Sequence, residues 1–277
     1  MKATDDVVDD PAVTDVRLDP LILAFYQDRY REDERLTRSA HGRLEFVRTQ
    51  ELLRRFLPPA PARVLDVGGG TGAHARWLAA DGYAVHLIDP VPEHVARARL
   101  LDGVSAADGD ARALRAADDS VAATLLLGPL YHLVDVEDRL LALREATRVT
   151  QPGGLVVAAA ISRYSPLLEL GGAGQLDDVT TRECERLLAT GRHHDDPRGF
   201  TSAHFHLPDE LAWELRAVGL RDVVVLGVEG PSAPALDNVP LDQVDALLPA
   251  AMRCALVVEA DPAMIAASPH LLAVGHA

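Results

Sequence analysis

The chain has 277 residues, of which 48% are hydrophobic and 25% charged, a composition typical of one globular domain or two small ones. Its formal net charge is −15, which disfavours a nucleic-acid partner because phosphate binding requires clustered lysine and arginine. The two cysteines, Cys184 and Cys254, show neither metal-site spacing nor a disulfide pattern. No apolar run approaches the roughly 20 residues that span a bilayer, and the acidic N-terminus lacks the apolar core of a signal peptide. We therefore expect a cytoplasmic protein without a membrane segment.

The first 61 residues precede the main fold. Residues 1–18 are polar and acidic, so we expect a disordered tail. Apolar residues at helical spacing predict helices over 21–36 and 43–57, the second ending before Pro58 and Pro59. We interpret residues 19–61 as an N-terminal helical cap on a domain that spans 62–277.

From residue 62 onward, strand and helix patterns alternate, which is typical of a parallel sheet covered on both faces. A turn is expected at 151–154, where the sequence is Gln-Pro-Gly-Gly. The expected strands are 63–67, 84–88, 104–106, 121–127, 155–161, 221–228 and 271–274, and the expected helices are 71–81, 92–101, 135–149, 208–218 and 241–259, with Pro249 interrupting the last.

Residues 162–206 break this alternation. They are rich in glycine, histidine and aspartate and contain one helical pattern over 178–190, so we interpret them as a lid over a substrate site. His204 and His206 would share one face of an extended segment and are candidates for substrate contact. The alternative is a solvated polar loop. The histidines of the lid match no common zinc spacing, so we expect no metal site.

The segment 64–73 carries the strongest signal for a ligand. An apolar strand pattern leads into Gly68, Gly70 and Gly72, which can adopt positive φ and let the backbone approach a ligand closely. The helix that follows points its N-terminal amides at the same place. Asp89 lies 21 residues after Gly68, a distance typical of an acid that binds a ribose. The spacing Gly68-x-Gly70-x-x-Ala73 also fits the fingerprint of NAD enzymes.

Three features resemble the class I S-adenosylmethionine (SAM) dependent methyltransferases instead. They are Asp66 two residues before Gly68, the Asp66-x-Gly68-x-Gly70-x-Gly72 spacing, and the later Gly109-Asp110-Ala111. The resemblance implies a Rossmann-like α/β fold with a mostly parallel seven-stranded sheet in the order 3-2-1-4-5-7-6, with strand 7 antiparallel. It implies SAM as cofactor, S-adenosylhomocysteine (SAH) as product, and methyl transfer (EC 2.1.1.-) to O, N or C of a small acceptor.

The resemblance also implies roles for individual residues around the cofactor. The glycine turn and Asp66 would hold the methionine part, Asp89 the ribose, and Asp110 or Asp108 the adenine. Turn formation is the alternative for these aspartates. The expected cofactor-binding residues are Asp66, Gly68, Gly69, Gly70, Gly72, Asp89, Pro90, Asp110, Ala111, Leu127, Gly128, Arg48 and Tyr26.

The segment 127–133 follows the fourth strand, where the crevice of an open α/β sheet lies. Its Gly-Pro-Leu-Tyr-His stretch resembles a bacterial small-molecule methyltransferase subgroup. Tyr131 and His132 are the expected catalytic residues, with His132 as a base because a histidine titrates near neutral pH. Packing on the cofactor is the alternative for both. The expected substrate-binding residues are Tyr131, His132, Arg163, His204 and His206.

Arginines on the N-terminal helices, Arg43 or Arg48, would neutralise the methionine carboxylate of the cofactor. A charged helix face in water is the alternative. Two other functions compete with methyl transfer. One is an NAD(P)-dependent oxidoreductase, although Lys2 is the only lysine and a catalytic lysine is therefore excluded. The other is a protein that binds SAM without methylating. We expect a monomer or homodimer that acts on a small molecule.

Overall fold

The computed structural model describes residues 25, 36, 39–195, 200–236 and 239–277. The expected tail, most of the first helical pattern and Tyr26 lie outside this range. The division into a cap and a main domain stays a prediction. Within the part of the chain that the structure describes, no helix has the length and apolar character needed to cross a bilayer.

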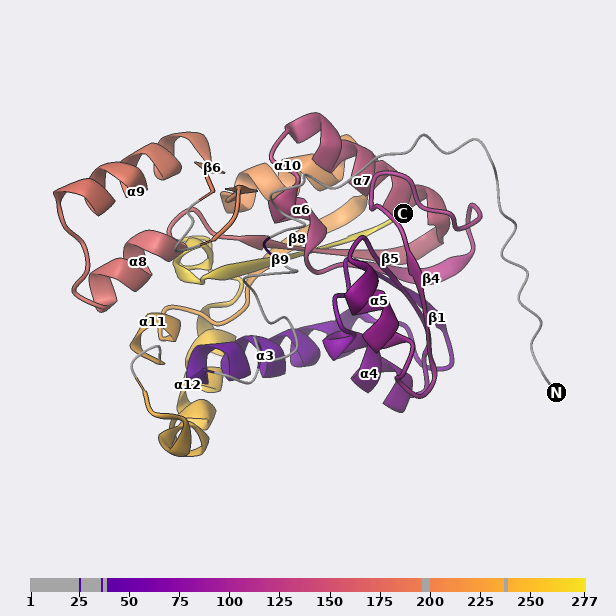
Figure 1. Cartoon of the computed structure of the whole chain (residues 1–277), viewed down its shortest axis with the longest axis horizontal. Helices are drawn as coiled ribbons and strands as arrows, with labels where there is room; N and C mark the ends of the chain where they lie inside the picture. The colour runs from indigo at the N-terminus through magenta and orange to yellow at the C-terminus, as the bar shows by residue number, and fades with distance from the viewer. Residues whose placement is uncertain (1–24, 26–35, 37–38, 196–199, 237–238) are drawn as a thin grey trace.

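A seven-stranded sheet in the order β3-β2-β1-β4-β5-β9-β8 forms the centre of the molecule (Figure 1). β1 pairs in parallel with β2 and β4, whereas β9 runs antiparallel to both of its neighbours, β5 and β8. This is the order that the resemblance implies, so the expected fold is confirmed. The strands are β1 Arg63–Val67, β2 Ala84–Asp89, β3 Val104–Asp108, β4 Val121–Leu126, β5 Thr150–Ile161, β8 Arg221–Gly227 and β9 His270–His276.

The expected turn at 151–154 is wrong, because these residues belong to β5. Val121 pairs with Thr150 and Ala123 with Leu155, so the register between β4 and β5 shifts at this point. The extra residues form an irregularity in the strand, with Gly153 at a φ of +76°.

Helices cover both faces of the sheet. Adjacent residues of a strand point to opposite faces. Leu65 accordingly packs in one buried cluster with α7 (Val136–Val149) and α10 (Pro208–Ala217), while Val64 packs in the other. The second cluster includes residues of α3, α4 and α5. Their bounds are Ala40–Phe56, Ala73–Ala80 and Pro92–Ala98.

The N-terminal helix α3 begins at an N-cap, Ser39, whose hydroxyl accepts a hydrogen bond from the Gly42 amide at 2.9 Å. Its buried residues Ala40 and Leu44 pack against α11 and α12. This packing joins the start of the described chain to the segment between β8 and β9. That segment comprises α11 Ala233–Leu236, η2 Leu241–Gln243, α12 Val244–Val258 and η3 Ile265–Ala267.

The expected lid contains α8 (Ser165–Gly172), α9 (Asp178–Thr190) and a two-stranded ribbon of β6 (Arg192–His193) and β7 (Ala203–His204). Figure 1 shows α8 and α9 projecting beyond the end of the sheet. The helix expected over 178–190 is confirmed. The sequence analysis missed α8, and it also missed the single turn α6 (Pro129–His132) after β4.

Candidate active site

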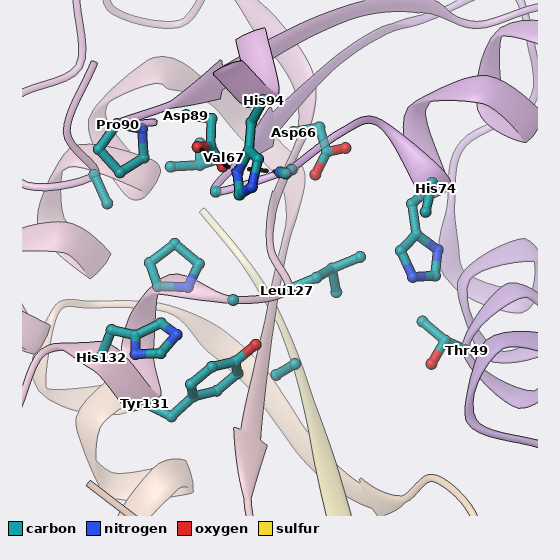
Figure 2. A pocket seen from close by; sticks show the side chains of 18 of the residues that line it. Thr49, Asp66, Val67, His74, Asp89, Pro90, His94, Leu127, Tyr131 and His132 are labelled. Carbon is teal, nitrogen blue, oxygen red and sulfur yellow. Dashed lines mark hydrogen bonds and ion pairs between the residues drawn. The ribbon is translucent and has the colours of Figure 1, made fainter. Parts of the chain in front are cut away.

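A cavity lies at the carboxyl ends of the central strands, where the sequence predicts a cofactor crevice. Figure 2 shows Asp66 and Asp89 along one side and Tyr131 and His132 across from them. The cavity encloses about 1200 Å³ of empty space, including its opening to solvent. The residues predicted for the cofactor that line it are Asp66, Gly68, Gly69, Gly70, Asp89, Pro90, Asp110, Ala111, Leu127 and Gly128.

The glycine turn joins β1 to α4 with three left-handed residues. Gly68, Gly70 and Gly72 have φ values of +69°, +58° and +89°, which side chains other than glycine rarely adopt. A Cβ on Gly68 would lie 2.7 Å from Cγ of Pro129, so the turn packs closely against the loop after β4. Gly72 does not line the cavity; it is the N-cap of α4 and gives that helix no side-chain cap.

Asp66 is a buried carboxylate that lines the cavity. Its side chain is 1% exposed, and neither carboxylate oxygen has a hydrogen-bond partner among the described residues. Burial, together with the nearby charge of Asp89, raises the pKa of Asp66 to about 7. A buried carboxylate without a partner is unfavourable, so this site is suited to a cationic ligand that restores the missing interaction.

Asp89, at the end of β2, anchors the turn. Its Oδ2 accepts a hydrogen bond from the Gly70 amide at 2.8 Å, and its Oδ1 accepts one from the Val91 amide at 2.9 Å. Nδ1 of His94 lies 3.1 Å from the same Oδ1. Each carboxylate oxygen has two lone pairs, so a ribose hydroxyl still finds an acceptor here.

Asp110 is engaged with Arg112. Its Oδ1 accepts from the Arg112 amide at 2.8 Å, and its Oδ2 from the guanidinium at 2.7 Å. Asp110 and the Ala111 backbone line the cavity, whereas Asp108 is exposed and does not. Of the two aspartates considered for adenine, the position of Asp110 therefore favours it.

Tyr131 and His132 lie on α6, with ring centroids 4.7 Å apart. Phe200, which follows the undescribed part of the lid, stacks obliquely on His132 with centroids 5.6 Å apart. Burial lowers the pKa of His132 to about 3. The premise that His132 titrates near neutral pH is therefore wrong, and this imidazole is neutral at physiological pH.

Three predicted substrate-binding residues do not line the cavity. His204 Nε2 lies 3.0 Å from Oε1 of Glu210, and His206 Nε2 lies 3.3 Å from Oε2 of Glu214. Arg163 donates to the Phe205 carbonyl and to Glu210. These side chains join residues 163–206 to α10, and their acidic partners, Glu210 and Glu214, lie on a helix that the sequence analysis did not connect with them.

The predicted arginines are also committed elsewhere. Arg48 is fully buried and donates to the Val228 carbonyl at 2.9 Å and to Glu259 at 2.6 Å, besides an ion pair with Glu51. Arg43 pairs with Asp245 on the surface. No arginine or lysine occurs among the described residues that line the cavity, so the expected arginine for the methionine carboxylate is not found there.

The sequence analysis missed four polar residues that line the cavity: Thr49, His74, His94 and His270. Thr49 lies one residue after Arg48, and His74 is the second residue of the helix that follows the glycine turn. Figure 2 shows Thr49 and His74 together at the end of the cavity nearest Asp66. The sequence around Thr49 and His74 carried a signal, whereas His270, the first residue of the last strand, carried none.

The lining fits SAM better than a dinucleotide. Its carboxylates, Asp66, Asp89 and Asp110, suit the ammonium and sulfonium charges of SAM and the hydroxyls of its ribose. The pyrophosphate of NAD(P) would instead face this acidic surface without a basic side chain among the described lining residues.

Comparison with known proteins agrees with this fit. A family described as a methyltransferase domain matches residues 64–154. The chain is 32% identical over 185 residues to a ubiquinone biosynthesis O-methyltransferase of Xanthomonas axonopodis pv. citri, covering 65% of this chain and 68% of that relative. It is 40% identical over 101 residues to an uncharacterized methyltransferase of Mycobacterium tuberculosis, covering 36% of this chain and 40% of that relative.

Among solved structures, a SAM-dependent methyltransferase of Thermotoga maritima, described as a possible histamine N-methyltransferase, is similar with a TM-score of 0.55. The two share 18% sequence identity, and the match covers 86% of this chain and 91% of that one. At this identity the likeness concerns the fold.

Proposed function

Because this chain belongs to the class I SAM-dependent methyltransferases, we propose that it transfers the methyl group of SAM to an oxygen atom of a small organic acceptor. SAM as the cofactor follows from the family. The size class of the acceptor and the atom methylated are our proposal.

The observation that carries the proposal is the extent of the cavity. Besides Asp66 and Asp89, its lining includes residues of β5 and β9, and we assign that side of the cavity to the acceptor. Its lining includes Ala159, Val228 and Leu272, so it favours a compact and partly apolar molecule. Oxygen is favoured because the relative from Xanthomonas is named an O-methyltransferase.

Methyl transfer asks mainly for placement, since the sulfonium of SAM is already activated. The protein must hold the acceptor oxygen in line with the methyl group and exclude water. Asp66, Asp89 and the glycine turn would fix the cofactor, while α6 would form the wall beside the acceptor. The net charge of −15 favours a small acceptor over nucleic acid.

The test is a transfer assay with SAM labelled in its methyl group. Purified protein is incubated with phenols, aliphatic alcohols, amines and carboxylic acids of low molecular weight, and products are identified by mass spectrometry. We expect label in a methyl ether. Label only in amine products would overturn the choice of oxygen.

A binding measurement separates the other interpretations. We expect calorimetry to detect binding of SAH and not of NADH. If SAH binds but label reaches no acceptor and no metabolite of a cell extract, the protein binds the cofactor without methylating.

A further inference from the structure

We propose that His270, oriented by Glu229, is the general base that removes the proton from the acceptor hydroxyl group. This inference rests on the proposed function and adds a catalytic residue to it. His270 begins β9 and pairs with Ile161 at the end of β5, so it lies at the carboxyl edge of the sheet together with the cavity.

The location suits an acceptor rather than the cofactor. The part of the cavity near β5 and β9 is lined by Ala159, Leu272 and Val228, and Glu45 of α3 lies beside His270 there. Besides Tyr131 and His132 of α6, the titratable side chains among the described residues of this part are Glu45 and His270. When a methyl acceptor bound there loses its hydroxyl proton, the imidazole of His270 lies beside it to take up that proton.

Glu229 fixes the orientation of the imidazole. It is fully buried, and its Oε1 lies 2.5 Å from Nδ1 of His270. Its Oε2 accepts from the Ser268 hydroxyl at 2.9 Å and from the His270 amide at 3.0 Å. Ser268 and the His270 backbone thus hold the Glu229 carboxylate against the imidazole ring of His270.

The protonation of the pair follows from its charges. Oε2 of Glu229 accepts from the Ser268 hydroxyl and from the His270 amide, as an ionised carboxylate does. An ionised carboxylate only accepts hydrogen bonds, so Nδ1 of His270 is the donor to Oε1. In the neutral ring the lone pair is therefore on Nε2, the atom that takes a proton in a carboxylate–histidine dyad.

Two further charged groups face the dyad, both from α3. His41 Nε2 lies 3.5 Å from Glu229 Oε1, and Glu45 Oε2 lies 3.9 Å from His270 Nδ1. His41, Glu229 and His270 together also have the composition of a metal site. Nδ1 and Oε1 lie at hydrogen-bond distance, which suits the dyad, and the Zn²⁺ experiment below distinguishes it from a metal site.

The resulting step conserves protons and electrons. His270 Nε2 accepts the hydroxyl proton and becomes an imidazolium stabilised by Glu229. The oxygen lone pair forms the new bond to the methyl carbon. SAM supplies that methyl group, and its sulfur keeps the electron pair of the broken S–C bond. The imidazolium then releases its proton to water.

The first test needs no acceptor. The ring resonances of ¹⁵N-labelled histidine are titrated in the wild type and in Glu229→Gln, with His270 assigned from His270→Gln. We expect the midpoint of the His270 titration to fall by about one pH unit or more in Glu229→Gln, because the imidazolium loses its counter-charge. His276, at the opposite end of β9, is the internal control.

Equal midpoints in both proteins would overturn the dyad, whatever the protein methylates. Tight binding of Zn²⁺ that displaces the Nδ1 proton would overturn it in favour of a metal site. If Glu229→Gln does not fold, Ser268→Ala serves in its place, since it removes one of the bonds that hold the carboxylate.

The second test measures turnover with a phenol that the labelled-SAM assay identifies. We expect His270→Ala to lower kcat about 100-fold or more while SAH affinity is unchanged, and added imidazole to restore part of the rate. His276→Ala is the matched control and keeps wild-type turnover. A parallel loss of SAH affinity and turnover without imidazole rescue would show that His270 only shapes the cavity. If the wild type methylates nothing, the proposed function fails, and the titration still decides the dyad.

Discussion

Arg139 and Glu214 meet in the interior, with Nη2 of the arginine 2.8 Å from Oε1 of the glutamate and both side chains buried. Arg139 belongs to α7 and also donates to the carbonyl groups of Leu133 and Val134, in the loop after α6. Glu214 belongs to α10, and its other oxygen faces His206 of the lid. The pair therefore joins the loop after α6, the helices α7 and α10, and the segment that carries β7 to one another.

Removing one partner of this pair should be costly. We expect Arg139→Met to lower the free energy of unfolding by about 3–5 kcal/mol, because Glu214 is left as a buried charge with a weaker partner. Arg43→Met, which breaks the exposed pair with Asp245, should cost about 0–1 kcal/mol. Urea denaturation measures both. Similar costs for the two variants would contradict the structural role of the buried pair.

Gly70 offers a test of the glycine turn. We expect Gly70→Val to abolish SAH binding, because a branched side chain beside the cavity would occupy cofactor space. The residue has a φ of +58°, so the variant should also lose about 1–2 kcal/mol of stability. Gly153→Ala is the matched control, since Gly153 has a φ of +76° but no atom within 4 Å of an added Cβ. Calorimetry should detect SAH binding by Gly153→Ala and not by Gly70→Val. Binding by Gly70→Val would refute the assignment of the turn.

Local patterns predicted the fold well where one segment determines its own structure. β1 lies at the residues that the sequence predicts, because its apolar run leads directly into the glycine turn, and four of its five residues are buried in the structure. The turn expected at Gln-Pro-Gly-Gly is wrong because these residues form an irregularity of β5 between the pairs Thr150–Val121 and Leu155–Ala123, and they bond to Ala277, contacts that no local pattern shows. The short helices α6 and α8 were missed because their local patterns are weak: α6 is only one turn long, and α8 ends in two glycines.

The candidate site divides in the same way. Asp66, Gly68 and Asp89 sit in short motifs whose spacing alone brings them together. The roles expected for Arg48 and His206 depended on which charges face them, and their partners Glu259 and Glu214 belong to other elements. A buried charge needs a counter-charge, but the sequence does not say which one the fold supplies. The pairing of Glu229 with His270 was not predicted for the same reason, since the two residues are 41 positions apart in the chain.

The protonation of Asp66 should link cofactor binding and stability to pH. Its folded pKa of about 7 exceeds the ordinary value, so the folded state holds the proton more tightly. The free energy of unfolding should therefore fall as pH rises from about 4 to 7, by at most about 4 kcal/mol from this group. SAH carries an ammonium group and should bind the ionised form, so its affinity should rise with pH up to about 7.

Asp66→Asn isolates this contribution. In this variant the fall in stability between pH 4 and 7 should be absent relative to the wild type, and SAH should bind weakly with little dependence on pH. Urea denaturation and calorimetry at pH 5, 6, 7 and 8 give the two comparisons. A wild-type pH dependence of SAH affinity that persists in Asp66→Asn would assign it to another group.

His132 should affect pH dependence in the opposite direction. Its folded pKa of about 3 lies below the ordinary value of about 6.5, so the unfolded state takes up a proton first as the pH falls. Stability should therefore be lost between pH 6.5 and 3, by at most about 5 kcal/mol from this group, and His132→Asn should not show this loss. Because Tyr131 and His132 line the cavity and are proposed to lie beside the acceptor, turnover should fall more than SAH affinity in this variant. The acid limb of the pH–rate profile should stay where it is in the wild type, since the base is elsewhere. A limb that disappears in His132→Asn and persists in His270→Ala would return the base to His132.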